Sequence, residues 1–373
     1  MNPRDLEAVC ALRARLHACP ELSGHEDVTI DTLQDFLSYK TSLRLERREG
    51  WLLATHWEAD GLPEIGLRAD MDAIPVEGES GTSARHGCGH DGQSAILCGV
   101  GLALEGRRTG RNIRLIFQGG EEDGTGARRI CERWPGLQAL ERIYALHNLP
   151  GFPVGQLLVR RGCFACASSG LIVRVQGRPA HAAYPDEGAN PAALLSRLVL
   201  DLPGMIGRIL DGDDRLLMHT VIGLRLGGEN FGLSASEGQL CLTLRGHRQA
   251  DIDALADAVR RAASEGCAAE GMTCTFETRD AFPDTTNAAP VVEEALGLWQ
   301  RAGLQATELE APMRWSEDFG WYLKRIPGMY FGVGAGEDCP GLHTAEYASF
   351  DDALIAPALA AFEALLPPSP VCQ

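Results

Sequence analysis

The chain has 373 residues, 45% of them hydrophobic and 23% charged, which is typical of globular rather than disordered proteins. This length is too great for one small core and suits two domains. The formal net charge of −17 argues against nucleic-acid binding, because no block of lysine and arginine offsets it. No stretch approaches about 18 uninterrupted apolar residues, so we expect no membrane span.

The N-terminus lacks the continuous apolar core that a signal peptide needs. The twelve cysteines lack the dense, even spacing of a secreted disulfide scaffold. We therefore expect a cytoplasmic protein with free thiols.

The first part of the chain alternates apolar runs of strand length with helical patterns. Residues 65–69, 113–117 and 142–146 are the apolar runs, and residues 91–104 have the pattern of an amphipathic helix. This alternation predicts an α/β fold with a mostly parallel, mixed sheet flanked by helices. In such sheets the chemistry collects beyond the carboxyl ends of the strands.

The middle of the chain has a different order of elements, β-α-β-β-α-β, which is that of a ferredoxin-like α+β unit. Strand patterns and helical patterns alternate there at residues 169–177, 190–210, 216–226, 239–245, 251–265 and 272–278. Pro203 is expected to interrupt the first of the two helices. After residue 280 the helix and strand alternation resumes and ends with a strand at 328–333. We therefore expect one discontinuous domain, residues 1–168 and 281–373, with residues 169–280 inserted into it.

Polar residues follow the apolar runs of the first domain directly. Asp70 and Asp72 follow the first run, Glu121 and Glu122 the second, and His147 the third. Because the carboxyl ends of parallel strands lie at one edge of a sheet, these side chains are expected to lie close together.

Cys88 and His90 are separated by one glycine, and a second glycine precedes them. Two ligands at this spacing can approach one cation only if the backbone bends, which glycine permits. Thiolate and imidazole suit zinc, nickel, cobalt or manganese better than calcium or magnesium. The alternative is a buried thiol beside a helix-capping histidine.

Glu121 and Glu122 are adjacent carboxylates, which repel one another unless cations or protons compensate. One of them can bind a metal while its neighbour stays available as a base. The alternative is a solvated acidic loop, but four glycines within five residues of the pair indicate tight turns.

His147 and His343 are single histidines, and each alone is more often a core or surface residue than a ligand. Their positions give them weight, because His147 follows a predicted strand and His343 follows the last one. Together with the Cys88–His90 loop, these strand ends predict one metal centre.

At these residues the sequence resembles the aminoacylase, hippurate-hydrolase and auxin-conjugate-hydrolase branch of the dinuclear metallopeptidase family. The motifs that carry the resemblance run nearly end to end and are highly specific as an ordered set. They are residues 15–23 (RLHACPELS), 68–75 (RADMDAIP), 88–92 (CGHDG), 121–122 (EE), 145–147 (ALH), 180–185 (AHAAYP) and 316–319 (SEDF).

The resemblance implies two divalent metal ions per subunit, which would be Zn, Mn, Ni or Co. Their ligands would be Cys88, His90, Glu122, His147 and His343. Glu121 would be the general base, and Asp70 or Asp72 would orient the metal site. The ferredoxin-like insert would be a lid that mediates a homodimer, and its His181 would reach a catalytic site, often the partner's, and stabilise the oxyanion.

The function that follows is metal-dependent hydrolysis of the amide bond of an N-acyl amino acid or a similar small carboxylate. A metal-bound hydroxide would attack the carbonyl, with Glu121 taking the proton from the water. A dipeptidase or carboxypeptidase with the same site is one alternative. A catalytically idle ligand-binding homologue and a cysteine hydrolase that uses Cys88 are the others.

Three positions depart from the family pattern. Gln93 stands where the family usually has a second histidine, and the loop at residues 75–87 is shorter than usual. The lid segment 232–235 replaces a family motif whose asparagine usually contacts substrate. Arg245 could bind a substrate carboxylate from the lid, with a surface salt bridge as the alternative.

Overall fold

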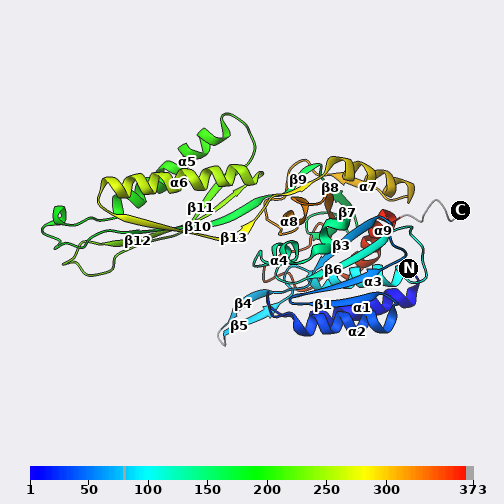
Figure 1. The fold of residues 1–373 in the computed structure, drawn as a ribbon. Helices are drawn as coiled ribbons and strands as arrows, with labels where there is room; N and C mark the ends of the chain where they lie inside the picture. Colours follow the sequence, from blue (N-terminus) through cyan, green and yellow to red (C-terminus); the bar gives the residue numbers. More distant parts are fainter. Residues whose placement is uncertain (79–80, 367–373) are drawn as a thin grey trace. The chain divides into compact units, whose positions relative to one another are not determined.

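The computed structural model describes residues 1–78 and 81–366. The chain divides into two compact units, which Figure 1 shows in the colours of the sequence. Unit 1 comprises Met1–Phe164, Thr285–Pro312 and Asp318–Gln373, and unit 2 comprises Ala165–Asp284 and Met313–Glu317. The expected insert at residues 169–280 falls within unit 2.

Unit 1 is built on an eight-stranded mixed sheet. From one edge to the other its strands are β1 (Arg44–Arg48), β2 (Trp51–His56), β6 (Asn112–Gln118), β3 (Glu64–Asp70), β7 (Leu140–Leu149), β16 (Gly328–Gly334), β8 (Leu157–Val159) and β15 (Ala306–Glu308). The four central strands, β6, β3, β7 and β16, pair in parallel, so their carboxyl ends lie at one edge. Strands β1 and β2 add antiparallel pairs at one side, and β8 pairs antiparallel with β16.

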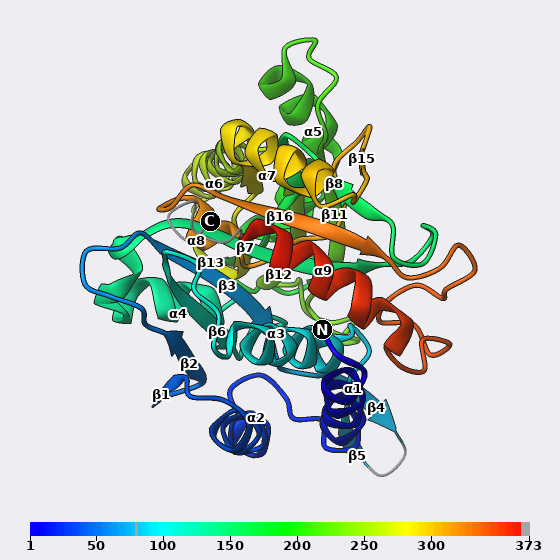
Figure 2. The ribbon, with the colours of Figure 1, turned by 90° about the vertical axis from the view of Figure 1, so that its right-hand side faces the viewer.

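Helices flank this sheet, as Figures 1 and 2 show. In chain order they are α1 (Pro3–His17), α2 (Asp27–Lys40), α3 (His90–Leu104), α4 (Gly126–Arg133), α7 (Ala289–Arg301), α8 (Gly320–Leu323) and α9 (Ile355–Leu365). Buried residues of α1, α2, α3, α7 and α9 form one continuous hydrophobic cluster with the sheet. Helices α4 and α8 contact each other outside that cluster. The predicted α/β architecture with a mostly parallel sheet is confirmed.

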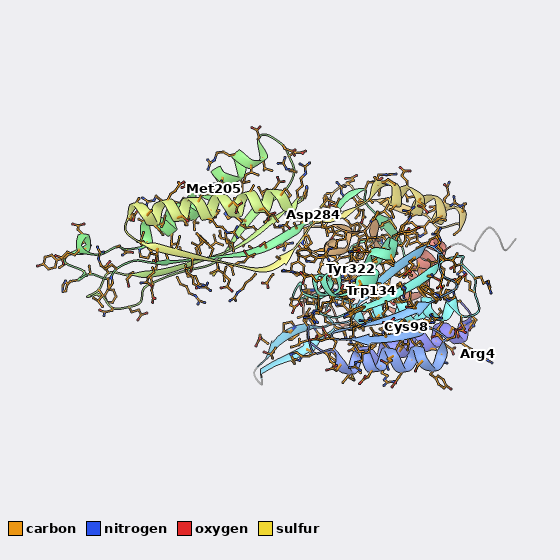
Figure 3. All side chains as sticks on the ribbon, viewed as in Figure 1. Arg4, Cys98, Trp134, Met205, Asp284 and Tyr322 are labelled. Carbon is orange, nitrogen blue, oxygen red and sulfur yellow. The ribbon has the colours of Figure 1, made fainter. Side chains whose placement is uncertain are left out.

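Helix α3 connects this core to the site. Almost all of its residues are buried, because it lies between the sheet and helices α1 and α9. Cys98, labelled in Figure 3, is fully buried within it. Gly92 has no side chain because a Cβ there would lie 2.3 Å from the Phe350 ring. The helix begins at His90, so the core packing of α3 fixes the first turn, where His90 lies.

Unit 2 contains a four-stranded antiparallel sheet in the order β11-β12-β10-β13. Its elements in chain order are β10 (Ala167–Gln176), α5 (Ala192–Leu210), β11 (Leu217–Leu226), β12 (Glu237–Gly246), α6 (Gln249–Ala269) and β13 (Thr273–Phe282). Helices α5 and α6 pack with the sheet around a separate hydrophobic core. This is the predicted β-α-β-β-α-β order.

The expected interruption of α5 at Pro203 is wrong, since the helix continues from Ala192 to Leu210. Proline removes one backbone hydrogen bond and clashes with the carbonyl four residues earlier. Pro203 is exposed, whereas Leu202 and Met205 beside it are buried in the core of unit 2. Figure 3 labels Met205 on this helix. Burial of the apolar face therefore outweighs the local cost of the proline.

The remaining elements are short. They are the hairpin β4 (Ile74–Gly78) and β5 (Gly81–Arg85), the pair β9 (Gly162–Ala165) and β14 (Thr285–Asn287), and the 3-10 turns Pro135–Ala139, Pro185–Glu187 and Asp352–Leu354. Among the described residues, no helix has both the length and the hydropathy to span a membrane.

Candidate metal centre

Side chains from separate segments of unit 1 bring potential ligand atoms together. Three overlapping groups form, and within each group the ligand atoms all lie within 4.8 Å of one another. They are Cys88 with His90 and His147, Cys88 with Glu122 and His343, and His90 with Glu121 and Glu122. The five ligands expected from the sequence and the expected base therefore converge in one place.

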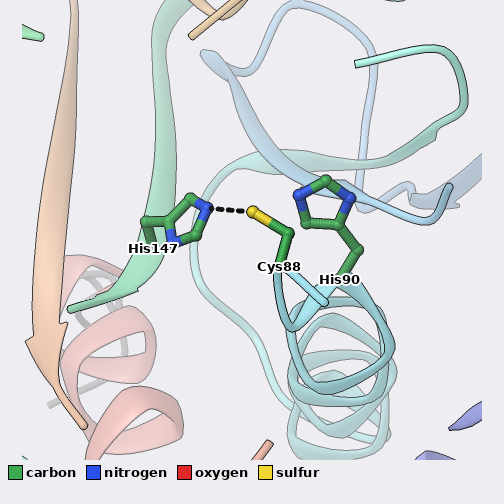
Figure 4. A group of neighbouring side chains, drawn as sticks. All are labelled: Cys88, His90 and His147. Carbon is green, nitrogen blue, oxygen red and sulfur yellow. Dashed lines mark hydrogen bonds between the residues drawn. The ribbon is translucent and has the colours of Figure 1, made fainter. Parts of the chain in front are cut away.

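Cys88 lies at the centre of this cluster. Its Sγ is 3.4 Å from Nε2 of His147, the contact drawn in Figure 4. The rings of His90 and His147 meet nearly at right angles, with centroids 6.0 Å apart. Figure 4 shows both imidazoles flanking the sulfur, one from the start of α3 and one from β7. Gly89, between Cys88 and His90, has a φ of 92°, so the left-handed bend that this spacing needs is present.

Glu122 and His343 complete the cluster. Oε1 of Glu122 is 3.4 Å from Nε2 of His343 and 3.9 Å from Nε2 of His90. His343 has a φ of 64°, and its N–H donates to the carbonyl of Gly87. That bond ties the long loop after β16 to the segment that carries Cys88.

The electrostatics of the cluster favour a thiolate at Cys88 and protonated imidazoles beside it. Burial alone raises the pKa of Cys88, but the charges of His90 and His147 outweigh it and hold the pKa well below its usual range. Hydrogen bonds to Cys88 and Glu122 raise the pKa of His343 to about 10. Burial and the nearby Cys88 raise the pKa of Glu122. The negative charge of the cluster thus attracts protons onto His90 and His343, and a bound cation would replace those protons.

These residues fit a pair of divalent cations. Nε2 of His90 is buried and makes no hydrogen bond within residues 1–78 and 81–366. A buried nitrogen without a hydrogen bond costs free energy unless a ligand satisfies it. Thiolate, imidazole and carboxylate together suit first-row divalent ions such as zinc, manganese, nickel or cobalt.

Asp72 contacts the cluster from behind. Its Oδ1 lies 3.4 Å from Nδ1 of His90, and its backbone carbonyl lies 2.9 Å from the same nitrogen. The carbonyl acceptor keeps a proton on Nδ1 and leaves Nε2 as the ligand atom. Asp72 Oδ2 also accepts the backbone N–H of Glu122 at 3.0 Å. Of the two aspartates considered from the sequence, Asp72 is the one that contacts a candidate ligand.

Asp70 has a different environment. It forms a fully buried ion pair with Arg68, which also pairs with Asp318. Gln118 donates from its amide to both oxygens of Asp318, and Tyr322 donates to Gln118. This buried network links β3, β6 and the segment before α8.

Neither this network nor a second contact is predictable from the sequence pattern. Asp318 was visible only as part of the SEDF motif, and its partners lie up to 250 residues away in sequence. His17 makes the second contact, and its Nδ1 lies 2.8 Å from Asp91, the residue after His90. No local pattern marks either contact.

His147 is placed differently from the prediction. It was expected to follow its strand, but β7 continues to Leu149. The strand is longer because residues 148 and 149 still pair with β16. Nδ1 of His147 lies 2.9 Å from the carbonyl of Asn148, which leaves Nε2 directed at Cys88.

Glu121 lies in the turn between β6 and α4. Its side chain is 6% exposed, and its Oε1 accepts the backbone N–H of Asp318 at 3.4 Å. Gly120 has a φ of 71°, and a Cβ on Gly126 would lie 2.0 Å from the carbonyl of Gly119. The glycines therefore allow a compact turn, and an open acidic loop is excluded.

His181 and Arg245 belong to unit 2, and neither is part of the metal cluster. Nδ1 of His181 accepts the backbone N–H of Ala183 at 3.1 Å, so its proton is on Nε2. Arg245 donates to the hydroxyl of Ser316 at 2.8 Å and to the carbonyl of Arg314. The surface salt bridge considered for Arg245 is absent from the described part of the chain.

The three departures have structural counterparts. The side chain of Gln93 is buried, and neither of its amide atoms makes a hydrogen bond to another described residue. The loop at 75–87 contains the β4–β5 hairpin, of which Glu79 and Ser80 lie outside the described residues. The segment 232–235 pairs with the His181 loop, since Ala182 donates to Gly232 and Ser234 donates to Ala180.

Comparisons with known proteins agree with this architecture. The chain is 29% identical over 361 residues to N-acetyldiaminopimelate deacetylase from Shouchella clausii, covering 92% of this chain and 93% of the relative. It is 26% identical over 371 residues to thermostable carboxypeptidase 2 from Saccharolobus solfataricus, covering 94% and 93%. The solved structure of a dinuclear metal binding peptidase of the M20 family from Bacillus subtilis matches with a TM-score of 0.81 and 22% identity, covering 98% of each chain.

The family model for peptidase family M20/M25/M40 matches residues 66–367. This match covers most of the chain, including all five candidate ligands and Glu121. The chain therefore belongs to peptidase family M20/M25/M40 and is a hydrolase of amide bonds.

Proposed function

We propose that this chain removes the acyl group from an N-acyl amino acid with the help of two divalent cations. Cys88, His90, Glu122, His147 and His343 would hold the ions. The observation that carries the proposal is the convergence of these five ligand atoms with Glu121 in one cluster, in which Cys88, His90, Glu121 and His147 are buried and His343 lies at the exposed side. The full-length similarity to a relative named as a deacetylase supports the acyl amino acid as substrate class.

Divalent cations at these residues would supply Lewis-acid polarisation of the amide carbonyl and lower the pKa of water. Glu121 is the general base, because it lies beside His90 and Glu122 without being needed as a ligand. Its carboxylate takes a proton from the attacking water and later gives it to the leaving nitrogen. The backbone N–H of Asp318 holds one of its oxygens and so limits its orientation.

The two units divide the work in this proposal. Unit 1 binds the metals, and unit 2 acts as a lid. His181, with its proton on Nε2, is a donor suited to a developing oxyanion. Arg245 has no ion pair among the described residues and is partly buried. It is the lid residue best suited to a substrate carboxylate, since guanidinium binds carboxylate with two parallel hydrogen bonds.

We further propose that unit 2 forms a homodimer through β11. This strand is at the edge of its sheet and exposes Val221, Ile222 and Leu224. Exposed apolar edge strands promote pairing with another chain unless they are covered. A second copy of the same strand would cover both the apolar side chains and the unpaired backbone groups.

A carboxypeptidase is the second candidate, supported by the similarity to the enzyme from Saccharolobus solfataricus. The same metals and base would serve either reaction. The candidates differ in what lies on the acyl side of the scissile bond, which is a simple acyl group in one and a peptide in the other.

The test is a hydrolysis assay with controlled metal content. Chain stripped with a chelator is reconstituted separately with Zn²⁺, Mn²⁺, Ni²⁺ or Co²⁺. It is then assayed on N-acetyl and N-benzoyl amino acids, on dipeptides, and on N-acetyl amino acids whose carboxylate is amidated. We expect loss of activity on chelation, recovery with metal, preference for N-acyl amino acids, and lower kcat/KM for the amidated compounds.

Glu121→Ala should retain two metal ions and lose about 10²- to 10⁴-fold in kcat, the range for a general base. Asp123→Ala is the matched control, because Asp123 is exposed and its carboxylate binds only Thr125 in the hydrogen bonds of this turn. It should keep most of the activity. Near-native turnover by Glu121→Ala would contradict the base assignment. Turnover that survives chelation would point to a cysteine hydrolase, and a metal-loaded chain without turnover would point to an idle homologue.

A further inference from the structure

Residues 21–26, which we call the N-terminal strap, join α1 to α2 and run beside the end of β3. The backbone N–H of Ala73 donates to the carbonyl of Glu21 at 2.8 Å. Leu22 forms a parallel bridge with Ala73. The strap is therefore fixed next to Asp72, although it precedes the segment that the family model matches.

Glu26 is the most deeply buried acidic group of the strap, with 2% of its surface exposed. Its Oε1 accepts two backbone N–H groups, from Gly24 at 2.8 Å and from Gly120 at 2.9 Å. No lysine, arginine or histidine of the described residues forms an ion pair with it. Burial raises its pKa. A buried carboxylate without a cationic partner lowers the stability of the fold. Stability therefore does not explain why a glutamate stands at this position.

Capping of the following helix does not explain Glu26. It occupies the N-cap position of α2, but its side chain makes no cap hydrogen bond. Glu21 performs that role, since its carboxylate accepts the N–H groups of Val28 and Thr29 and the hydroxyl of Thr29. The side chain of Glu26 instead turns toward the loop that carries the proposed base.

The loop is shaped to receive this carboxylate. A Cβ on Gly119 would lie 2.5 Å from Cδ of Glu26, so only glycine allows the approach. Gly120, whose N–H is bound, has a φ of 71° and directly precedes Glu121. Glu26 thus holds the N–H of Gly120, the residue directly before the proposed base Glu121.

A second strap residue holds the far side of the base. The hydroxyl of Ser23 donates to Oδ2 of Asp72 at 2.7 Å. The same oxygen accepts the N–H of Glu122 at 3.0 Å. The strap therefore fixes the backbone N–H groups of the two residues that flank Glu121, that of Gly120 directly and that of Glu122 through Asp72.

We propose that Glu26, assisted by Ser23, is a positioning residue for the amide hydrolysis, which holds the Glu121–Glu122 turn in its working geometry. This inference rests on the proposed function of Glu121 and Glu122. Small displacements of a catalytic group lower turnover strongly, and residues that support metal ligands act in the same way. The strap supplies such support from a part of the chain that holds no ligand and no base.

The test compares Glu26→Ala, Glu26→Gln, Ser23→Ala and Glu21→Ala in the full chain loaded with Co²⁺. Glu26→Ala should lower kcat about 10- to 100-fold, with a much smaller change in KM, because the turn loosens while the substrate contacts stay. Its visible Co²⁺ absorption spectrum should also change, since Glu122 belongs to the same turn. Glu26→Gln should recover most of kcat and of the spectrum, because an amide oxygen accepts the same two N–H groups. Ser23→Ala should lower kcat less, in the same direction.

Glu21→Ala is the matched control, since the side chain of this strap carboxylate binds, among the residues that the structure describes, only Val28 and Thr29 at the start of α2. It should lower the melting temperature and leave kcat and the spectrum as in the unmodified chain. The proposal is overturned if Glu26→Ala has the same kcat and the same Co²⁺ spectrum as Glu21→Ala. It is also overturned if Glu26→Gln lowers kcat as much as Glu26→Ala does. An unmodified chain without chelator-sensitive hydrolysis would refute the proposed function instead, and the Co²⁺ spectra would still test the strap.

Discussion

Two aspartates at the end of β3 differ in their partners despite being two residues apart. Asp70, the last residue of the strand, forms a buried ion pair with Arg68. Asp72 lies beyond the strand, and both its carboxylate and its backbone carbonyl lie beside Nδ1 of His90. We therefore propose that Asp70 stabilises the sheet edge and that Asp72 orients the candidate ligand His90.

Substitution should separate these two effects. Asp72→Ala should weaken metal binding about 10- to 100-fold, because such supporting groups fix the ligand's tautomer and ring orientation. Asp70→Ala should instead destabilise the chain by about 3–5 kcal/mol, because it removes one partner of a buried ion pair. Metal titration and chemical unfolding of the metal-free chain measure the two effects. If Asp70→Ala weakened metal binding and Asp72→Ala did not, Asp70 rather than Asp72 would be the residue that orients the ligand.

At the scale of single residues, the sequence predicts the candidate site residues that local patterns mark. Cys88, His90, Glu121 and Glu122 could be selected because apolar runs, glycines and adjacent ligands are local patterns. The Arg68 and Asp318 ion pair could not be selected, since it joins residues 250 positions apart and each appears as an ordinary charged residue. The role of Glu26 could not be predicted either, because it depends on a turn that lies 94 residues later.

At the scale of elements, local rules fail where burial opposes them. Proline was expected to break α5, but the buried stripe that includes Leu198 and Leu202 keeps the helix continuous. His147 was expected beyond its strand, but pairing with β16 extends β7 past it. The order of elements was predictable from periodicity, whereas these two details depend on neighbours that are distant in sequence.

The edge strand β11 provides a test of the proposed dimer. Ile222 lies at a register irregularity between Val221 and Gly223 and is 65% exposed. Ile222→Lys should convert a dimer to a monomer, because a lysine at an edge strand opposes pairing with another edge. Sedimentation velocity of the unmodified chain and the variant measures this change.

Leu200→Lys is the control for that experiment. Leu200 is an exposed apolar residue of α5, in the same unit but away from the sheet edge. It should leave the sedimentation coefficient unchanged. A monomeric unmodified chain, or equal dissociation by both variants, would contradict an interface at β11.

At the scale of the whole molecule, each unit has its own hydrophobic core. All five candidate ligands belong to unit 1. Without a cation, unit 1 keeps the Cys88 thiolate beside the Glu122 carboxyl, whose pKa the thiolate raises, and protons on His90 and His343 compensate the negative charge. Unit 2 holds no comparable group of ligands among the described residues. Metal binding should therefore stabilise one unit and not the other.

Chelation should lower the melting temperature of unit 1 selectively. A ligand at 100 times its Kd stabilises the folded state by about 2.7 kcal/mol, so removal of tightly bound metal should produce a shift that is readily measured. Differential scanning calorimetry with and without chelator should show two transitions, of which only one moves. Leu198→Ala, in the core of unit 2, identifies the other transition, because a core truncation of this kind costs about 2–5 kcal/mol. Equal shifts of both transitions on chelation would contradict a metal centre confined to unit 1.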